Sequence, residues 1–166
     1  DAKFAQDSRQ YSIMSYFDAY ETGAQHIDWA NLRFGYASTP MVHDIVAIQK
    51  LYGADKTTRT GDTVYGFNST AGKSVFDFTV NKAPIVTIWD AGGTDTLRLT
   101  NTTNQPFPDV EGSQWSVIDL AEGAGSVIGF LNEGDYGLSN TVNGQVVRPY
   151  GLTPTVYIAH GAVIED

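Results

Sequence analysis

The sequence predicts an α+β fold that is mostly β, in which one amphipathic helix is followed by a series of short strands. Hydrophobic residues make up 42% of the 166 residues and charged residues only 17%, a balance that supports a folded core rather than a disordered chain. Near Lys56 the apolar pattern changes from a helical period to short runs of β-branched and aromatic residues. We therefore expect two units, residues 1–56 and 57–166.

The helix is expected over residues 40–52. Thr39 is a suitable N-cap, Pro40 suits the first helical position, and Gly53 can end the helix with a positive φ. Further apolar residues widen the apolar face, so we expect the helix to be buried on much of its circumference. The apolar positions that repeat at intervals of four, three and four are Met41, Ile45, Ile48 and Tyr52.

The strands are expected after Lys56, as short apolar runs separated by Gly, Asn, Asp and Pro. Their even spacing is typical of a sandwich or roll. Residues 101–114 and 132–154 are predicted to be long loops, and residues 1–37 a mostly irregular segment. The expected strands are Thr63–Phe67, Ser74–Phe78, Ile85–Trp89, Thr96–Leu99, Ser116–Leu120, Ser126–Leu131 and Thr155–Ala159.

The net charge of -9 argues against nucleic acid and anionic membranes as partners, because both select basic surfaces. Clustered carboxylates instead suit divalent cations such as calcium. The chain has no cysteine, so disulfides and cysteine-ligated zinc are excluded. No apolar run approaches the length of a membrane span, and no signal peptide is visible. The opening at Asp1 suggests a processed product or an internal piece.

The segment Ser12-Ile13-Met14-Ser15-Tyr16 carries the strongest link to a known chemistry. It resembles the Met-turn of the metzincin zinc endopeptidases, and its Met-to-Tyr spacing is similar to that of the serralysins, secreted calcium-dependent bacterial proteases of peptidase family M10. This resemblance implies that Met14 lies beneath zinc-binding histidines. It also implies that Tyr16 is a catalytic residue that reaches the zinc and assists the oxyanion. Taken alone, the same string also suits an ordinary buried turn.

The resemblance continues along the chain in the same order. "PMVHDIVAIQKLYGA" at Pro40–Ala54 is similar to the helix after the serralysin Met-turn, and "TRTGDTVYGFNS" and "WDAGGTDTL" resemble the family's calcium loops. A weaker match follows at "IAHGAVIED". The implied architecture is the end of a metzincin catalytic domain followed by a calcium-binding domain of β-sandwich or β-roll type, which in the family often continues into glycine-rich repeats.

The second calcium-like loop has a chemical logic of its own. Asp90 and Asp95 flank Gly92 and Gly93, and calcium takes six to eight oxygen ligands from carboxylates and carbonyls. Glycines let the backbone fold so that carbonyls face an ion. The run partly matches the G-G-x-G-x-D-x-U-x repeat of calcium-binding rolls. Ordinary hairpin turns are the competing explanation, since Gly-Gly and Asp-Thr are common turn formers.

The resemblance adds five further calcium ligands. The alternation of Arg59, Gly61 and Thr63 would direct their carbonyls the same way in an extended segment, and the resemblance assigns these carbonyls to the same ion pair. It also implies a carbonyl from Val163 and a carboxylate from Glu165. We therefore expect about two calcium ions, bound by groups that include three carboxylates.

The H-E-x-x-H motif, which supplies zinc ligands and a catalytic Glu, does not occur in the chain. The three histidines, His26, His43 and His160, have no ligand-like spacing and are expected to be surface or core residues, with His26 kept as a candidate for a substrate cleft. The chain is thus predicted to be a part of a zinc endopeptidase that lacks its zinc helix and is inactive by itself. Met14 would then be exposed, which favours self-association or binding of the missing catalytic part.

A different function remains open at this point. The three tryptophans and nine tyrosines also suit a secreted, non-catalytic β module that uses calcium as a structural ion and binds glycan or protein. Protein or peptide substrates, an extracellular location and zinc in the intact enzyme are expected only from the resemblance.

Overall fold

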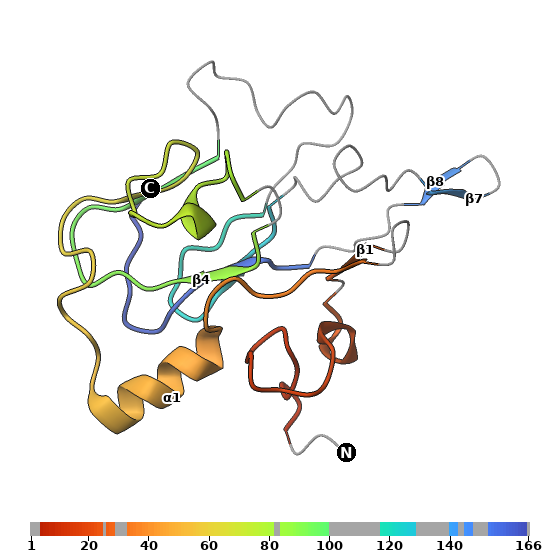
Figure 1. Cartoon of the computed structure of the whole chain (residues 1–166), viewed down its shortest axis with the longest axis horizontal. Coiled ribbons are helices and arrows are strands. Elements are labelled where there is room, and N and C mark those ends of the chain that lie inside the picture. The colour runs from red at the N-terminus through yellow and green to blue at the C-terminus, as the bar shows by residue number, and fades with distance from the viewer. Residues whose placement is uncertain are drawn as a thin grey trace.

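The computed structural model describes residues 4–24, 26–28, 33–81, 84–99, 117–128, 140–142, 145–147 and 153–165. This part of the chain is mostly β with one α-helix, as predicted (Figure 1). In chain order the elements are the 3-10 helix η1 (Ala19–Thr22), β1 (Ile27–Asp28), β2 (Arg33–Phe34), α1 (Val42–Tyr52), β3 (Val64–Gly66), the 3-10 helix η2 (Ser74–Phe76), β4 (Val86–Ile88), β5 (Thr96–Arg98), β6 (Gly125–Ser126), β7 (Asn140–Val142), β8 (Gln145–Val147) and β9 (Val156–Ile158).

The strands form small sheets with mixed pairing. β3 pairs with β5 in parallel, β9 lies between β4 in parallel and β6 antiparallel, and β1–β2 and β7–β8 are antiparallel pairs. Parallel neighbours need a crossover connection, so β3 and β5 bring the two predicted calcium loops to the same edge. This pairing is what places distant loop residues together.

Four of the predicted strands are confirmed in their central residues, as β3, β4, β5 and β9, whereas the predicted strand Ser126–Leu131 overlaps β6 only at Ser126. Ser74–Phe78 is wrong as a strand: it opens with η2, because the amides of Phe76 and Asp77 bond the carbonyls of Lys73 and Ser74. Within the described part of 116–120, Val117 makes one isolated bridge to Val127. The predicted loop 132–154 contains the β7–β8 pair, whereas 101–114 lies outside the described residues.

The main core is built from the inward side chains of β3, β4, β5 and β9 and from the residues after them. Such β-branched and aromatic side chains fit a pleated, buried surface. Its buried members are Tyr65, Phe67, Ala71, Phe76, Phe78, Val86, Ile88, Leu97, Ile128, Val156, Ile158, Ala162 and Ile164.

A second buried cluster joins the two predicted units. Met41 and Val42, from the start of α1, pack with Ile85 and Tyr157 from the β region, and Tyr11 covers them. Buried hydrogen bonds cross the same boundary: the Gln10 side-chain amide donates to the Tyr157 hydroxyl at 2.9 Å. Residues before and after Lys56 therefore share apolar and polar contacts rather than being separated by a linker.

Helix α1 differs from its prediction in its cap and its burial. Thr39 is not the cap, since its hydroxyl accepts the amide of Thr87 in β4 at 2.8 Å; Asp44 instead accepts the amide of Met41. Gly53 does end the helix with a positive φ of 83°. Only the first turn is buried, and Leu51 and Tyr52 are 73% and 82% exposed. Figure 1 shows α1 along one edge of the molecule, below β4.

Helix α1 has 11 residues, and none of the helices in the described part of the chain has the length and apolar character to cross a membrane.

Candidate functional site

The Met-turn-like segment is a hydrogen-bonded turn anchored on α1. Asp44 accepts the Ser12 hydroxyl at 2.6 Å and the Ile13 amide at 2.9 Å, and the Ser12 oxygen accepts the Met14 amide at 3.1 Å. Asp44 thus satisfies the helix N-terminus and holds the turn at the same time. These bonds from Asp44 hold residues 12–14 against the start of α1, although the two segments are about 30 positions apart in the sequence.

Met14 and Tyr16 project into solvent from this turn. Met14 is 77% exposed and Tyr16 is 93% exposed, so the alternative of an ordinary buried turn does not describe them. Among the described residues no group of three or more His, Asp or Glu side chains could hold a metal, so Tyr16 has no assembled zinc site around it.

The three histidines lie in unrelated surroundings. His26 is buried, with Nε2 at 3.4 Å from the Pro154 carbonyl, and burial lowers the pKa of its imidazole. It is therefore a core residue, and its assignment to a substrate cleft is wrong. His43 is exposed and stacks on Tyr11, with 5.3 Å between ring centroids. His160 is exposed and lies against Gly123.

The two calcium-like loops lie in direct contact. A Cβ added to Gly93, whose φ is 134°, would stand 2.5 Å from the carbonyl carbon of Gly61, so only glycine fits there. The Thr94 amide donates to the Asp62 carboxylate at 2.9 Å, and the Thr96 amide donates to the Thr63 carbonyl at 2.9 Å. Asp62 was not predicted from the sequence, although it stands between two predicted ligands.

Asp95 is the centre of this contact. It is fully buried, and its Oδ1 accepts the Thr63 amide at 2.8 Å. Its Oδ2 has no hydrogen-bond partner among the described residues. Glu165 closes the arrangement from the end of the chain, since its Oε2 accepts the Asp95 amide at 2.7 Å and its own amide donates to the Asp95 carbonyl at 3.0 Å.

The electrostatics of Asp95 are set by its burial and by two neighbouring carboxylates. Burial raises the pKa of Asp95, and the negative charges of Asp90 and Glu165 raise it further, against the stabilising bond from Thr63. A buried carboxylate costs free energy unless it is paired or coordinates a metal. The unbonded Oδ2 is therefore an oxygen that a bound cation could satisfy.

Asp90 lies beside this carboxylate but is bonded on both of its oxygens. It is 2% exposed; Oδ1 accepts the Gly92 amide at 3.0 Å and Oδ2 accepts the Tyr65 hydroxyl at 2.6 Å. The Arg59 Nε lies 3.8 Å from Oδ2. Tyr65 and the side chain of Arg59 were both missed from the sequence, because only the carbonyl of Arg59 was considered and Tyr65 is indistinguishable there from a core aromatic residue.

The backbone of the first loop departs from the extended form that was expected for residues 59–63. Arg59 has a φ of 51°, so the simple alternation of Arg59, Gly61 and Thr63 does not describe it. Gly92 and Gly93 have φ values of 146° and 134°, which requires glycine. Val163 is exposed near the end of the described chain.

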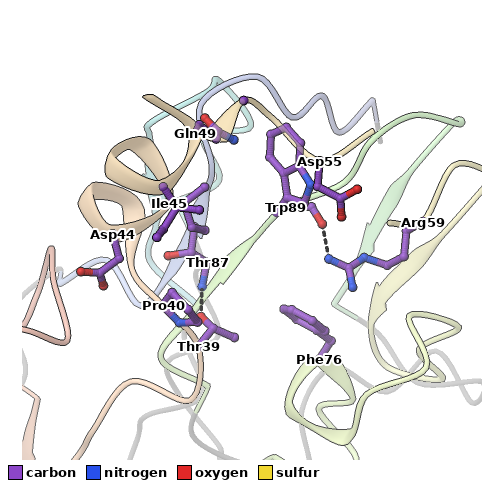
Figure 2. Close-up of a pocket in the computed structure, with 12 residues that line it drawn as sticks. Thr39, Pro40, Asp44, Ile45, Gln49, Asp55, Arg59, Phe76, Thr87 and Trp89 are labelled. Atoms are coloured by element: carbon purple, nitrogen blue, oxygen red, sulfur yellow. Dashed lines mark hydrogen bonds between the residues drawn. The ribbon is translucent and has the colours of Figure 1, made fainter. Parts of the chain in front are cut away.

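A hollow of about 380 Å³ lies between α1, η2 and the end of β4 (Figure 2). Apolar walls come from Ile45, Phe76 and Trp89, and the guanidinium of Arg59 reaches into it and donates to the Trp89 carbonyl. The sequence did not indicate this hollow, because it arises where the second half of α1 leaves the core.

The chain has clear relatives among known proteins. Residues 54–128 match the family described as Peptidase M10 serralysin C terminal. The chain is 40% identical to Serralysin C of Dickeya chrysanthemi over 100% of its own length and 27% of that relative. It is 46% identical to Serralysin of Proteus mirabilis over 68% of the chain and 22% of the relative.

A third relative, Metalloprotease AprA of Pseudomonas entomophila, is 47% identical over 62% of the chain and 21% of the relative. The chain thus spans about a quarter of the length of these relatives.

Proposed function

This chain belongs to the serralysin family of metalloproteases. Because the H-E-x-x-H motif does not occur in it, we propose that it is the calcium-stabilised, non-catalytic portion of a secreted zinc endopeptidase. Calcium ions join its two glycine-containing loops to Glu165. The intact protease would be secreted and would hydrolyse peptide bonds in proteins.

The observation that carries the calcium assignment is the buried Oδ2 of Asp95, which has no partner among the described residues. Few buried side-chain oxygens are left without a hydrogen bond, and each needs an explanation such as an ion. A hard cation with flexible oxygen coordination suits a site made from carboxylates and carbonyls. Carbonyls must supply most of the ligands, because the described residues contain no group of three metal-binding side chains.

The ligands belong to three separate parts of the chain. Asp90, Asp95 and Glu165 supply carboxylates that are divided between the two ions, since no three described side chains could hold one ion, and the remaining oxygens are backbone carbonyls. These carbonyls belong to Arg59, Gly61, Thr63, Gly92, Gly93 and Val163. Such a set cannot assemble in the unfolded chain, so the binding free energy of calcium stabilises the folded state.

In the intact protease, Tyr16 acts at the zinc. Zinc supplies a Lewis acid that polarises the scissile carbonyl and activates water. The phenol of Tyr16, exposed and next to the Met14 turn, donates a hydrogen bond to the oxygen that becomes negative. Met14 would provide the apolar floor of that site. This chain alone lacks the histidines and the catalytic Glu, and is inactive.

The calcium proposal is tested on the purified chain. Mass spectrometry of the desalted protein is expected to find about two calcium ions per chain. Excess EDTA is expected to lower the melting temperature by roughly 5–10 °C, the effect of removing a ligand present at about 100 times its Kd. Asp95→Ala should lower the melting temperature in calcium and abolish most of the EDTA effect.

Asp119→Ala is the matched control, since Asp119 is exposed and bonds only the nearby Ala121 amide and the Ser126 hydroxyl within the described residues. It removes the same charge and should respond to EDTA like the parent chain. A metal-free parent, or an Asp95→Ala chain that melts like the parent in calcium, would contradict the assignment.

A further inference from the structure

The side chain of Arg59 connects three groups around the proposed calcium site. Its Nε donates to the Tyr65 hydroxyl at 2.8 Å, and its Nη2 donates to the carbonyl of Trp89. The guanidinium carbon lies 5.2 Å from the centre of the Phe76 ring and 5.8 Å from that of Tyr65, within the range of cation–π attraction. Figure 2 shows the guanidinium between Trp89 and Phe76.

These contacts hold the backbone of Arg59 in a conformation that is unfavourable for arginine. Arg59 has a φ of 51°, a left-handed conformation that costs a residue with a Cβ free energy and persists where surrounding contacts enforce it. The planar fork of arginine can bond two acceptors at fixed angles, which a lysine ammonium cannot do. The side-chain contacts therefore hold the carbonyl end of residue 59 in place.

The same contacts orient Asp90. The Tyr65 hydroxyl accepts from Arg59 and donates to Asp90 Oδ2, so a single chain of hydrogen bonds runs from the first loop to the carboxylate that follows β4. The bond from Arg59 to the carbonyl of Trp89 fixes the residue directly before Asp90. The two loops are thus joined by side chains of this region independently of any ion.

We propose that Arg59 is a positioning residue of the calcium site, whose guanidinium holds the 58–63 loop and the Trp89–Asp90 segment in the binding geometry before calcium arrives. The inference rests on the proposed calcium function, and assigns to the side chain of Arg59 a role separate from the carbonyl ligand. Outer partners that orient metal ligands commonly change metal affinity by about 10- to 100-fold when they are removed.

Positioning and simple electrostatics predict opposite results for this residue. Arg59 carries a positive charge close to a cation site, so its removal would strengthen calcium binding if Coulomb repulsion were the main effect. If Arg59 positions the ligands, its removal weakens binding, because calcium must then order both loops. The sign of the change in Kd decides between the two.

The experiment is a calorimetric titration of calcium chloride into the EDTA-stripped, dialysed full chain, at a temperature where each apo variant is folded. Arg59→Met is expected to raise the calcium Kd by about tenfold or more. Arg9→Met is the matched control: Arg9 also pairs with an aspartate, Asp18 at 2.7 Å, and lies over a tyrosine ring. Arg9→Met should keep the parent Kd, although it changes the net charge equally.

A second variant guards against a failure of Arg59→Met to fold. Tyr65→Phe keeps the buried ring and removes only the hydroxyl that links Arg59 to Asp90, and it is expected to weaken calcium binding in the same direction. Hydrogen exchange of the parent in EDTA should show a protected amide at Thr63, which donates to Asp95 Oδ1, and Tyr65→Phe should reduce that protection.

Unchanged or tighter calcium binding by Arg59→Met and Tyr65→Phe would overturn the positioning role while leaving the calcium site intact. A parent chain that binds no calcium would instead overturn the proposed function and, with it, this inference.

Discussion

At the scale of single residues, Asp95 determines how the molecule responds to pH. Its carboxylate is fully buried, and its raised pKa means that the folded chain holds a proton more tightly there than the unfolded chain does. The metal-free folded state therefore gains stability from this group as the pH falls from neutrality toward 3.8, the ordinary value for Asp. Calcium reverses the dependence, because protons compete with the ion.

We expect the stability difference between the parent and Asp95→Asn chains to change with pH in opposite directions with and without calcium. In EDTA, the free energy of unfolding of the parent minus that of Asp95→Asn should increase as the pH falls from 7 to 5. In saturating calcium, this difference should decrease as the pH falls over the same range. The measurement is urea denaturation of both chains at the two pH values.

The buried His26 contributes the other way, since its lowered pKa removes stability as the pH falls below its ordinary value. That contribution is shared by both chains and cancels in the difference between them. If the stability difference between the two chains followed the same pH trend in EDTA and in calcium, Asp95 would not be a calcium ligand.

At the scale of elements, the contact between the two loops depends on glycine. The parallel pairing of β3 with β5 brings Gly61 and Gly93 together, and the backbones approach so closely that no side chain fits between them. Gly92 also has a positive φ, but a Cβ there would meet no atom within 4 Å. A side chain at position 92 would therefore cost only the free energy of an unfavourable φ, whereas a side chain at position 93 would add the cost of a clash with Gly61.

Gly93→Ala is expected to destabilise the chain more than Gly92→Ala. Gly92→Ala should cost about 1–3 kcal/mol, the strain of an unfavourable φ. Gly93→Ala adds a clash with the backbone of Gly61 worth roughly a further 1–3 kcal/mol. Urea denaturation in EDTA measures both, so that calcium affinity does not enter. Equal losses for the two variants would show that the loops separate easily.

At the scale of the whole molecule, several large apolar side chains of the described chain stand in solvent. Met14 and Tyr16 stand in solvent on one turn, and the second half of α1 exposes Leu51 and Tyr52. The chain spans about a quarter of the relatives it matches. If the proposed function is right, we expect the rest of a longer protein, or a second copy, to bind at these exposed apolar groups.

We expect the isolated chain to be inactive, because it has neither the zinc-binding histidines nor a catalytic base. Incubation of the purified chain with casein, excess zinc and calcium should release no peptides above a buffer blank. Addition of an intact serralysin serves as the positive control. Cleavage that persists after repeated purification, and that Tyr16→Phe removes, would contradict this expectation.

What the sequence determined by itself was local. Residue periodicity predicted α1, the β-rich remainder and the central residues of β3, β4, β5 and β9, and the order of motifs led to the serralysin-like assignment that the relatives confirm. The calcium ligands, expected from the glycine-containing loops and from the family resemblance, remain a proposal. Short-range rules could not predict the 3-10 turn at η2, because a run of Ser, Val and Phe suits either form until its hydrogen-bond partners are known.

Only the tertiary structure decided which groups lie together. It placed Gly61 against Gly93, joined Asp95 to Glu165, and showed Asp62, Tyr65 and the side chain of Arg59 around the same loops. It also showed that α1 is capped by Asp44 and is buried over its first turn alone. The physical reason is that burial, close approach and hydrogen-bond pairing between distant residues are set by the packing of parallel strands, which periodicity along the chain does not encode.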